Sequence, residues 1–447
     1  EFLMGIGEAT ATLVSHAVGF GNNHLAGQYA QIATVIYTVC SIPVMVLLYF
    51  TIYPTIRWLG LDHETAEFGQ KLVNVSVFSL ALEGIGEIME EFLCAASHEY
   101  FTASLDILTC LVNVLAVSVA IIKYDVELWF VGLIHLIVTL LWVIAMNAVA
   151  YYSGWLKVYL KGMLMNNAFE NRVAVKHIVA ASAPLALGNL LASAEYGVLM
   201  IFASYIGADA VSTWGILCTV WETLEATTDG IGDASEIRVA RHLGKGNPEQ
   251  AKISSYKSIF FALIASFIVS MCCILLHGII PAWFTPDPTI QQMLRDMIPL
   301  IGLANMCIAF GMVSWALVTA QGRMQYATIA VTLITWSFTI PLAALMIYYF
   351  RTGLEGAVIA VSIGYTLAGF VLLRTLYNSD WHQISKDIQE ANGFTGECYS
   401  DDENDSDSES KSTRLSLSSD STWTTKYSSR LITNHIDYDT EECSSQD

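Results

Sequence analysis

Charged residues are scarce in this chain of 447 residues. Only 14% are Asp, Glu, Lys or Arg, whereas soluble domains carry about a quarter. Hydrophobic residues make up 54%, and the mean hydropathy is +0.51. Apolar runs of at least 18 residues recur, for example at 35–53, 133–150 and 259–276. Each can cross roughly 30 Å of hydrocarbon as a helix. Because nothing reads as short alternating strands, the sequence predicts an all-α, polytopic membrane bundle.

Motifs of enzymes and metal sites are also missing. The nine cysteines form no CxxC pair and no zinc spacing, and there is no phosphate loop or nucleophile elbow. No signal peptide is recognisable, although the chain begins with Glu1 rather than Met. We therefore expect no enzyme, no cofactor, no metal site and no nucleic-acid partner. We expect a monomer in the lipid bilayer of a plasma or vacuolar membrane.

The formal charge of −20 is concentrated at one end of the chain. Residues 378–447 hold 16 Asp and Glu against 5 Lys and Arg. A segment this rich in Ser, Asp and Glu buries too little apolar surface to offset its ordering entropy. The sequence therefore predicts a disordered acidic tail over 378–447.

An internal repeat is the most informative feature. Residues 5–22 align without gaps on residues 230–247, an offset of 225, and the same offset places Asp62 on Asp287 and Ala95 on Ala320. Eight residues of the first segment are identical to the residue 225 positions later: Gly5, Ile6, Gly7, Ala9, Val14, Gly19, Gly21 and Asn22. Duplicated halves in a membrane bundle are typical of transporters, whose substrate sites lie between the halves.

The repeat organises the chain into two lobes. We expect an N-lobe over 1–152, a linker over 153–173 and a C-lobe over 174–377. The apolar helix before Gly230 has no counterpart before Glu1, so the N-lobe is expected to lack its first helix. Eleven of twelve spans are then predicted, near 1–20, 25–55, 66–97, 101–122, 128–152, 174–206, 209–243, 248–280, 289–321, 324–350 and 354–377.

Basic residues give the orientation. With alternating spans, one side receives eleven Lys and Arg and the other receives five. Because basic loops stay in the cytosol, the first side, which also holds the acidic tail, is expected to be cytoplasmic. The eleven are Lys157, Lys161, Arg172, Lys176, Arg238, Arg241, Lys245, Lys252, Lys257, Arg323 and Arg374.

The two Gly-x-Gly-Asn turns carry a specific resemblance. The segments TLVSHAVGFGN (12–22) and IRVARHLGKGNPEQA (237–251) resemble the paired signatures of the multidrug and toxic compound extrusion (MATE) family. This resemblance covers residues 1–377. It implies two six-helix lobes, alternating access, and export of small organic solutes, often cations, driven by inward H⁺ or Na⁺. The expected turn residues are Gly19, Gly21, Asn22, Gly244, Gly246 and Asn247.

The sequence departs from the family pattern at three places. His16 stands where Gln is more usual. The coupling carboxylate of the second lobe is displaced by about a turn, with Glu195 present and Ala192 nearer the usual place. The family's second carboxylate is absent, because 304–317 contains no acid.

Intramembrane carboxylates offer a replacement. An acid at a helix centre costs roughly 2.5–3.5 kcal/mol to insert, so it indicates function. The span 209–243 carries five acids at helical spacing, and the span 66–97 carries a similar set. We expect cation coupling or cation binding by Glu83, Glu87, Glu195, Glu222, Glu225 and Asp229. We place Glu90, Glu91, Asp233 and Glu236 in the cytoplasmic headgroup zone.

Two alternatives to a cation antiporter remain open. A carboxylate-lined channel or metal-cation transporter would also use clustered acids. A lipid-linked oligosaccharide flippase of the same wider superfamily is less favoured, because an acidic interior does not suit a pyrophosphate cargo.

Overall fold

The structure is a computed structural model that describes every residue except 1, 59–62, 125, 166 and 398–447. All regular elements within the described ranges are helical, which confirms the predicted all-α bundle. The N-terminal half contains α1 (Met4–Phe20), α2 (Asn23–Trp58), α3 (His63–Ala95), α4 (Glu99–Tyr124) and α5 (Leu128–Tyr152). A linker with η1 (Lys161–Met165) and η2 (Ala168–Glu170) follows.

The C-terminal half begins with two long helices and continues through a run of shorter ones. It contains α6 (Arg172–Ile206), α7 (Ala208–Gly244), α8 (Pro248–Leu276), α9 (Ile280–Phe284), α10 (Pro288–Ala320), α11 (Met324–Ile334), η3 (Thr335–Thr339), α12 (Ile340–Ala344), η4 (Leu345–Tyr349), α13 (Leu354–Asn378) and α14 (Trp381–Glu397). The elements from α11 to η4 form one continuous helical run, so all eleven predicted spans are helical.

Nine helices of the described residues are long and apolar enough to cross a membrane. The other two predicted spans, α1 and α7, do not meet that criterion. The α1 helix has only 17 residues, and α7 carries the row of acids. Both helices pack against each other and against further helices of the bundle.

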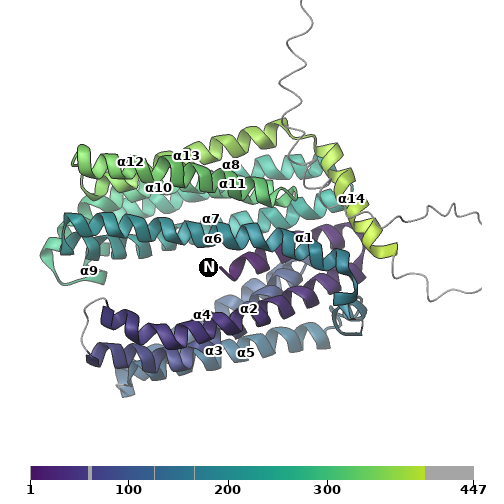
Figure 1. The fold of residues 1–447 in the computed structure, drawn as a ribbon, viewed down its shortest axis with the longest axis horizontal. Helices are drawn as coiled ribbons and strands as arrows, with labels where there is room; N and C mark the ends of the chain where they lie inside the picture. Colours follow the sequence, from purple (N-terminus) through teal and green to yellow (C-terminus); the bar gives the residue numbers. More distant parts are fainter. Residues whose placement is uncertain (1, 59–62, 125, 166, 398–447) are drawn as a thin grey trace, which may run out of the picture. The chain divides into compact units, whose positions relative to one another are not determined.

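The helices separate into two lobes, each with its own apolar core (Figure 1). The N-lobe comprises α1–α5 and the C-lobe comprises α6–α13. The α1 helix joins them, because it contacts α2 and α3 of its own lobe and α6 and α7 of the other. The two lobes therefore meet mainly along α1.

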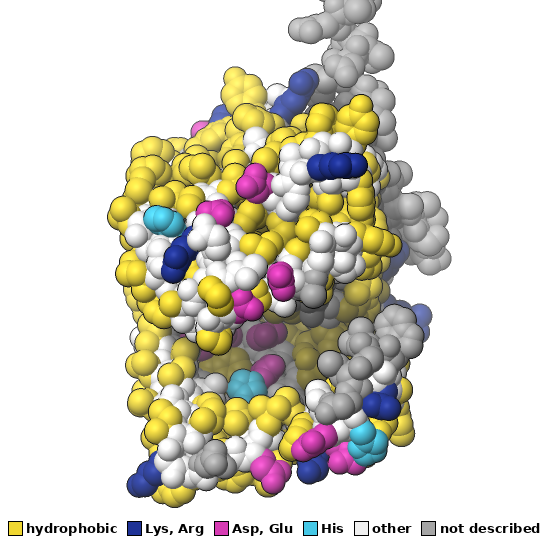
Figure 2. All heavy atoms as spheres, turned by 90° about the vertical axis from the view of Figure 1, so that its left-hand side faces the viewer, with side chains coloured by type: hydrophobic (Ala, Val, Ile, Leu, Met, Phe, Trp, Pro, Cys, Tyr) yellow, Lys and Arg dark blue, Asp and Glu magenta, His cyan; other side chains and the backbone are white. Residues whose placement is uncertain are grey.

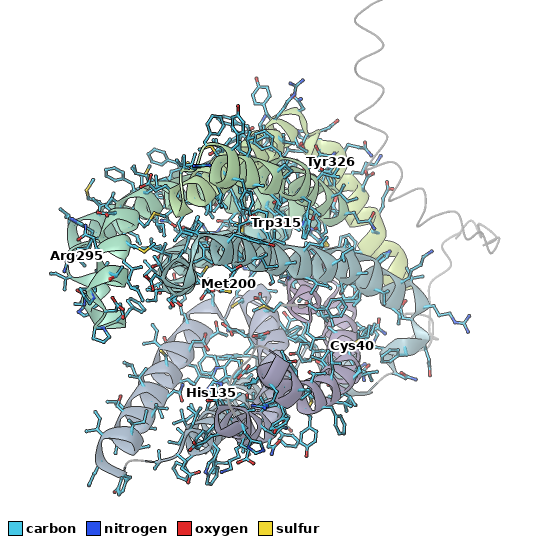
Figure 3. The ribbon with its side chains drawn as sticks, turned by 60° about the vertical axis from the view of Figure 1, so that its left-hand side comes forward. Cys40, His135, Met200, Arg295, Trp315 and Tyr326 are labelled. Atoms are coloured by element: carbon cyan, nitrogen blue, oxygen red, sulfur yellow. The ribbon has the colours of Figure 1, made fainter. Side chains whose placement is uncertain are left out.

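The space between the lobes is open at the end opposite α14. Figure 2 looks into that end and shows a hollow between the two halves, with Asp, Glu and His side chains inside it and a hydrophobic outer surface around it. Figure 3 places His135 in the N-lobe and Met200 and Trp315 in the C-lobe. A hollow with a polar interior inside an apolar exterior is the expected arrangement for a solute pathway through lipid.

The repeated turns have the same backbone geometry in both lobes. Gly21 (φ 93°) and Gly246 (φ 75°) adopt the left-handed conformation that glycine favours. The amide of Asn22 donates to the carbonyl of Ala17 at 2.9 Å, and the amide of Asn247 donates to the carbonyl of His242 at 2.9 Å. This bond pattern ends a helix sharply.

The predicted disordered tail over 378–447 is wrong for its first part. Residues 381–397 form α14, in which Trp381, Ile384 and Ile388 are buried against the C-lobe. These residues recur at i, i+3 and i+7, so one face of α14 is apolar. The acidic composition of the whole segment concealed that face. Residues 398–447 lie outside the described residues.

Candidate transport site

The C-lobe buries a carboxylate in the middle of α6. Glu195 is only 2% exposed, and neither of its carboxylate oxygens has a hydrogen-bond partner. It lies within electrostatic range of Glu225 on α7, and Tyr365 on α13 lies near both carboxylates. A buried carboxylate without a partner is strongly destabilising unless it is neutralised. This trio is therefore suited to hold a proton or a small cation.

The remaining acids of α7 continue from this trio along one helix face. Glu225 is half-buried, and its Oε1 atom is enclosed without a hydrogen-bond partner. Glu222 and Asp229 lie one turn to either side, are exposed and interact electrostatically with Glu225. The spacing of three and four residues therefore places Glu222, Glu225 and Asp229 in a row along one face of α7.

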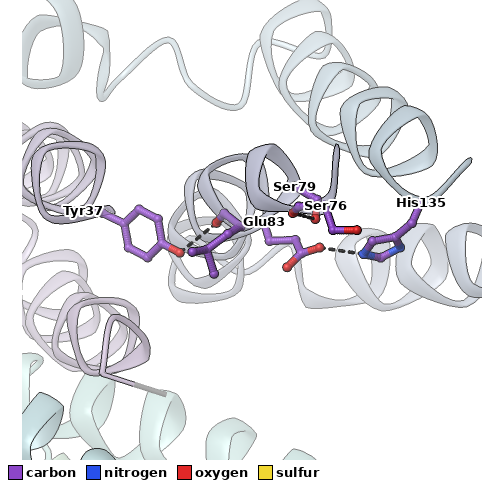
Figure 4. A network of polar contacts seen from close by, with 6 residues as sticks. Tyr37, Ser76, Ser79, Glu83 and His135 are labelled. Atoms are coloured by element: carbon purple, nitrogen blue, oxygen red, sulfur yellow. Dashed lines mark hydrogen bonds and ion pairs between the residues drawn. The ribbon is translucent and has the colours of Figure 1, made fainter. Parts of the chain in front are cut away.

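The N-lobe holds a different ionisable pair. The Nε2 atom of His135 on α5 lies 2.7 Å from the Oε1 atom of Glu83 on α3, and both side chains are partly exposed. Figure 4 shows this pair beside Tyr37 of α2, whose hydroxyl donates to the carbonyl of Leu80 at 2.9 Å. The Tyr37 ring packs onto Gly84, where any side chain would collide with it.

Glu87 belongs to the same region of the N-lobe. It is half-buried one turn after Glu83 and lies within electrostatic range of the Tyr37 hydroxyl. The structure thus brings Glu83 and Glu87 together in one lobe and Glu195, Glu222, Glu225 and Asp229 together in the other. The offset of 225 maps none of these acids onto another acid of the set, so similar backbones carry different chemistry.

Further acids meet where the two lobes touch. Glu91 of α3 lies within electrostatic range of Glu8 of α1 and of Asp233 and Glu236 of α7. Glu236 is 6% exposed and accepts a hydrogen bond from the hydroxyl of Thr12. Packing of α1 against α7 therefore encloses these acids within the protein, while their placement at the depth of the headgroups stays a prediction.

Glu90 also lies within the protein. It lies beside Asp106 of α4, and the Oδ1 atom of Asp106 accepts a hydrogen bond of 2.8 Å from Trp142. The headgroup depth of Glu90 likewise stays a prediction. Asp233 is exposed, but it faces Glu91 across the seam between the lobes.

Sequence reasoning missed His135, Tyr37 and Tyr365. Each is a single polar residue in an apolar span, and its partner is distant in the chain. His135 is 52 positions from Glu83, and Tyr365 is 170 positions after Glu195. A histidine in the middle of a span was the one available signal, since an ionisable group in a membrane helix indicates function.

Comparison with known proteins identifies the family. The MatE family model matches residues 2–122 and 184–345. An uncharacterised transporter of Saccharomyces cerevisiae, YDR338C, is 24% identical over 389 residues, which are 85% of this chain and 54% of the yeast protein. Protein DETOXIFICATION 34 of Arabidopsis thaliana is 24% identical over 400 residues, 87% of this chain and 70% of the plant protein.

Solved structures share the fold. The eukaryotic MATE transporter AtDTX14 superimposes with a TM-score of 0.77 at 17% identity, over 88% of this chain and 87% of that one. A Vibrio cholerae MATE transporter, VcmN, gives a TM-score of 0.75 at 16% identity, over 86% of each chain. The predicted resemblance is confirmed: the chain belongs to the multidrug and toxic compound extrusion family, whose members are membrane transporters and not enzymes.

Proposed function

We propose that this protein exports organic cations in exchange for H⁺ or Na⁺ by alternating access. One observation supports the exchange above all others, namely the burial of Glu195 without a partner next to Glu225. Such a site is stable only when a proton, a metal cation or a cationic solute neutralises it. Two cations that compete for one neutralising position are coupled in opposite directions, as antiport requires.

The hollow between the lobes suits an organic cation. Its acids on α3 and α7 attract positive charge from solvent, and low-dielectric walls strengthen that attraction. An anionic cargo such as a pyrophosphate would be repelled by the same acids. The acidic lining therefore favours cation export over the flippase alternative.

We place the α14 end in the cytosol, because the loops on that side carry the excess of basic residues. The open hollow in Figure 2 then faces away from the cytosol, which is the state in which an exporter releases its solute and binds the driving ion. The closed end is the one at which a cytosolic solute must enter. This conformation is therefore the outward-open half of the proposed cycle.

Transport into sealed vesicles tests this proposal. Vesicles with an imposed pH or sodium gradient should accumulate a fluorescent organic cation, and Glu225→Gln should abolish gradient-driven accumulation without loss of folded protein. Glu355→Gln provides a matched control, since Glu355 is an exposed acid at the first turn of α13. Solute flux that ignores both gradients, or current without counter-transport, would instead indicate a channel. Preferential transport of anions would contradict cation export.

A further inference from the structure

Two contacts near the α14 end of the bundle join the lobes, and the internal repeat relates them to each other. The Nε2 atom of His16 on α1 lies 2.9 Å from the carbonyl oxygen of Ala320, the last residue of α10. The guanidinium of Arg241 on α7 donates to the carbonyl oxygen of Ala95, the last residue of α3, at 2.7 Å. With the offset of 225, His16 is equivalent to Arg241, and Ala95 is equivalent to Ala320.

Both contacts cross from one lobe to the other. Each comes from a helix of one lobe and binds the C-terminal end of a helix in the opposite lobe. Such helix ends present carbonyl groups without intrahelical partners and carry partial negative charge. A carbonyl only accepts, so the Nε2 atom of His16 must carry the donated proton.

The Arg241 contact is the stronger of the two. Its guanidinium also donates to the carbonyl of Cys94 at 2.8 Å and to the Oγ atom of Ser97 at 2.7 Å. Hydrogen bonds from a charged donor are about twice as strong as neutral ones, and the rigid guanidinium fork can reach several acceptors at once. His16 makes one bond to its helix end, whereas Arg241 makes three.

Ser97 contacts Arg241 from a backbone conformation that is unfavourable for a residue other than glycine. It adopts the left-handed conformation (φ 74°), and its repeat partner Gly322 adopts the same conformation (φ 78°). A residue other than glycine is disfavoured there by roughly 1 kcal/mol. Of these two equivalent residues, Ser97 has a hydroxyl that accepts a hydrogen bond from Arg241, whereas Gly322 has no side chain. The side chain at this position therefore contributes to the contact between the lobes rather than to the turn.

We propose that Arg241, Ser97 and the carbonyls of Cys94 and Ala95 form, together with His16 and the carbonyl of Ala320, a paired gate that holds the cytoplasmic side closed. These residues are the gate residues. Every hydrogen bond of the gate must break when the lobes separate at this end. The gate residues therefore set the ratio of inward-open to outward-open protein, and the Arg241 half contributes most of the bias.

The proposal adds to the proposed function, since it takes alternating access from it, but it can be measured without a transported solute. Spin labels at Tyr152 of the N-lobe and Gln250 of the C-lobe, both exposed at the α14 end, report the distance between the lobes. They are introduced into the full chain with its nine native cysteines replaced by serine. Double electron–electron resonance in liposomes then gives the populations of short and long distances.

We expect Arg241→Ala to raise the ratio of long to short distances by about tenfold or more, because it removes charge-assisted bonds. His16→Ala should raise the ratio by only about threefold to fivefold, since it removes one neutral bond. Arg241→Lys should fall between wild type and Arg241→Ala, because an ammonium lacks the fork. Arg238→Ala is the matched control, since Arg238 is an exposed arginine three residues earlier on α7.

Ser97→Gly separates gating from folding. Glycine relieves the left-handed strain, so the melting temperature should not fall. The lost hydroxyl should still raise the ratio of long to short distances. If Arg241→Ala fails to fold, Ser97→Gly and His16→Ala decide the question. Distance distributions unchanged from wild type, or a shift in Arg238→Ala as large as in Arg241→Ala, would overturn the gate. If the variants shift the distances as expected but the protein transports no cation in vesicles, the gate is supported and the proposed function is contradicted.

Discussion

Gly19 and Gly244 occupy equivalent positions of the two repeats, and each faces the backbone of the opposite helix. A Cβ atom on Gly19 would collide with the carbonyl oxygen of Arg241, and one on Gly244 would collide with the carbonyl oxygen of His16. Helices α1 and α7 therefore approach as closely as their backbones allow. Small residues permit this packing in membrane bundles.

Alanine at either glycine should push α1 away from α7. We expect Gly19→Ala and Gly244→Ala each to lower the free energy of unfolding by about 1–3 kcal/mol, as overpacked sites do. Both should also raise the ratio of long to short distances between the spin-labelled lobes. Gly7→Ala is the control, because a Cβ atom there meets nothing within 4 Å. It should be neutral or stabilising by up to about 1 kcal/mol. Equal melting temperatures for Gly7→Ala and Gly244→Ala would contradict this close packing.

The buried Glu195 makes a prediction about stability. An ion that binds the folded protein and not the unfolded chain stabilises it by about 2.7 kcal/mol at a hundred times its dissociation constant. The melting temperature of wild type should therefore rise with sodium if Na⁺ is the coupling ion, or with falling pH if H⁺ is. Glu195→Gln should reduce that dependence strongly, whereas Glu355→Gln should preserve it. Thermal melts across sodium and pH series measure the effect, and an unchanged ion dependence in Glu195→Gln would exclude this carboxylate as the ion site.

His98 gives a pH dependence of its own. It lies in the turn between α3 and α4, its ring stacks on that of Trp155 at 4.1 Å, and burial lowers its pKa from 6.5. The unfolded chain then binds the proton more readily, so stability falls as pH drops through 6.5 and the lower folded value. The stability difference between wild type and His98→Gln should therefore shift against wild type between about pH 7.5 and about pH 5.5. A difference that stays constant over that range would show that His98 does not titrate differently on folding.

The α14 helix should contribute substantially to stability. Trp381 is 4% exposed in the apolar cluster that joins α14 to the C-lobe. Trp381→Ala should lower the free energy of unfolding by about 3–5 kcal/mol. The neighbouring His382 is exposed and contacts Glu249 at 3.2 Å on the surface, so His382→Ala should cost less than about 1 kcal/mol. Chemical or thermal unfolding of both variants provides the comparison, which fails if the two lose similar stability.

Composition and the repeat predicted most of the fold. Long apolar runs identify spans directly, because lipid requires every backbone group to be satisfied within a helix. The pairing of Gly21 with Gly246 depends on a short, fixed alignment, and the two turns have matching geometry. The α14 helix was missed because its apolar face has only three buried anchors, Trp381, Ile384 and Ile388, within a strongly acidic segment.

The candidate site was predictable only in part. Acids spaced by three or four residues reveal a common face on one helix, so the sequence predicts that Glu225 and Asp229 act together. Periodicity does not reveal which helix that face meets. The contact of Glu83 with His135 and that of Arg241 with Ala95 depend on tertiary packing between distant segments. For the same reason, the enclosure of Glu236 between α1 and α7 could not be derived from span edges.

Counter-flow in reconstituted vesicles tests the central claim most directly. Vesicles loaded with a fluorescent organic cation and an internal pH or sodium indicator are followed as the cation leaves, with wild type, Glu195→Gln and Glu355→Gln in parallel. The proposed exchange predicts that cation efflux drives H⁺ or Na⁺ inward in wild type and Glu355→Gln, and that Glu195→Gln loses this opposing ion movement. Cation efflux without any opposing ion movement in wild type, or full counter-flow in Glu195→Gln, would contradict it.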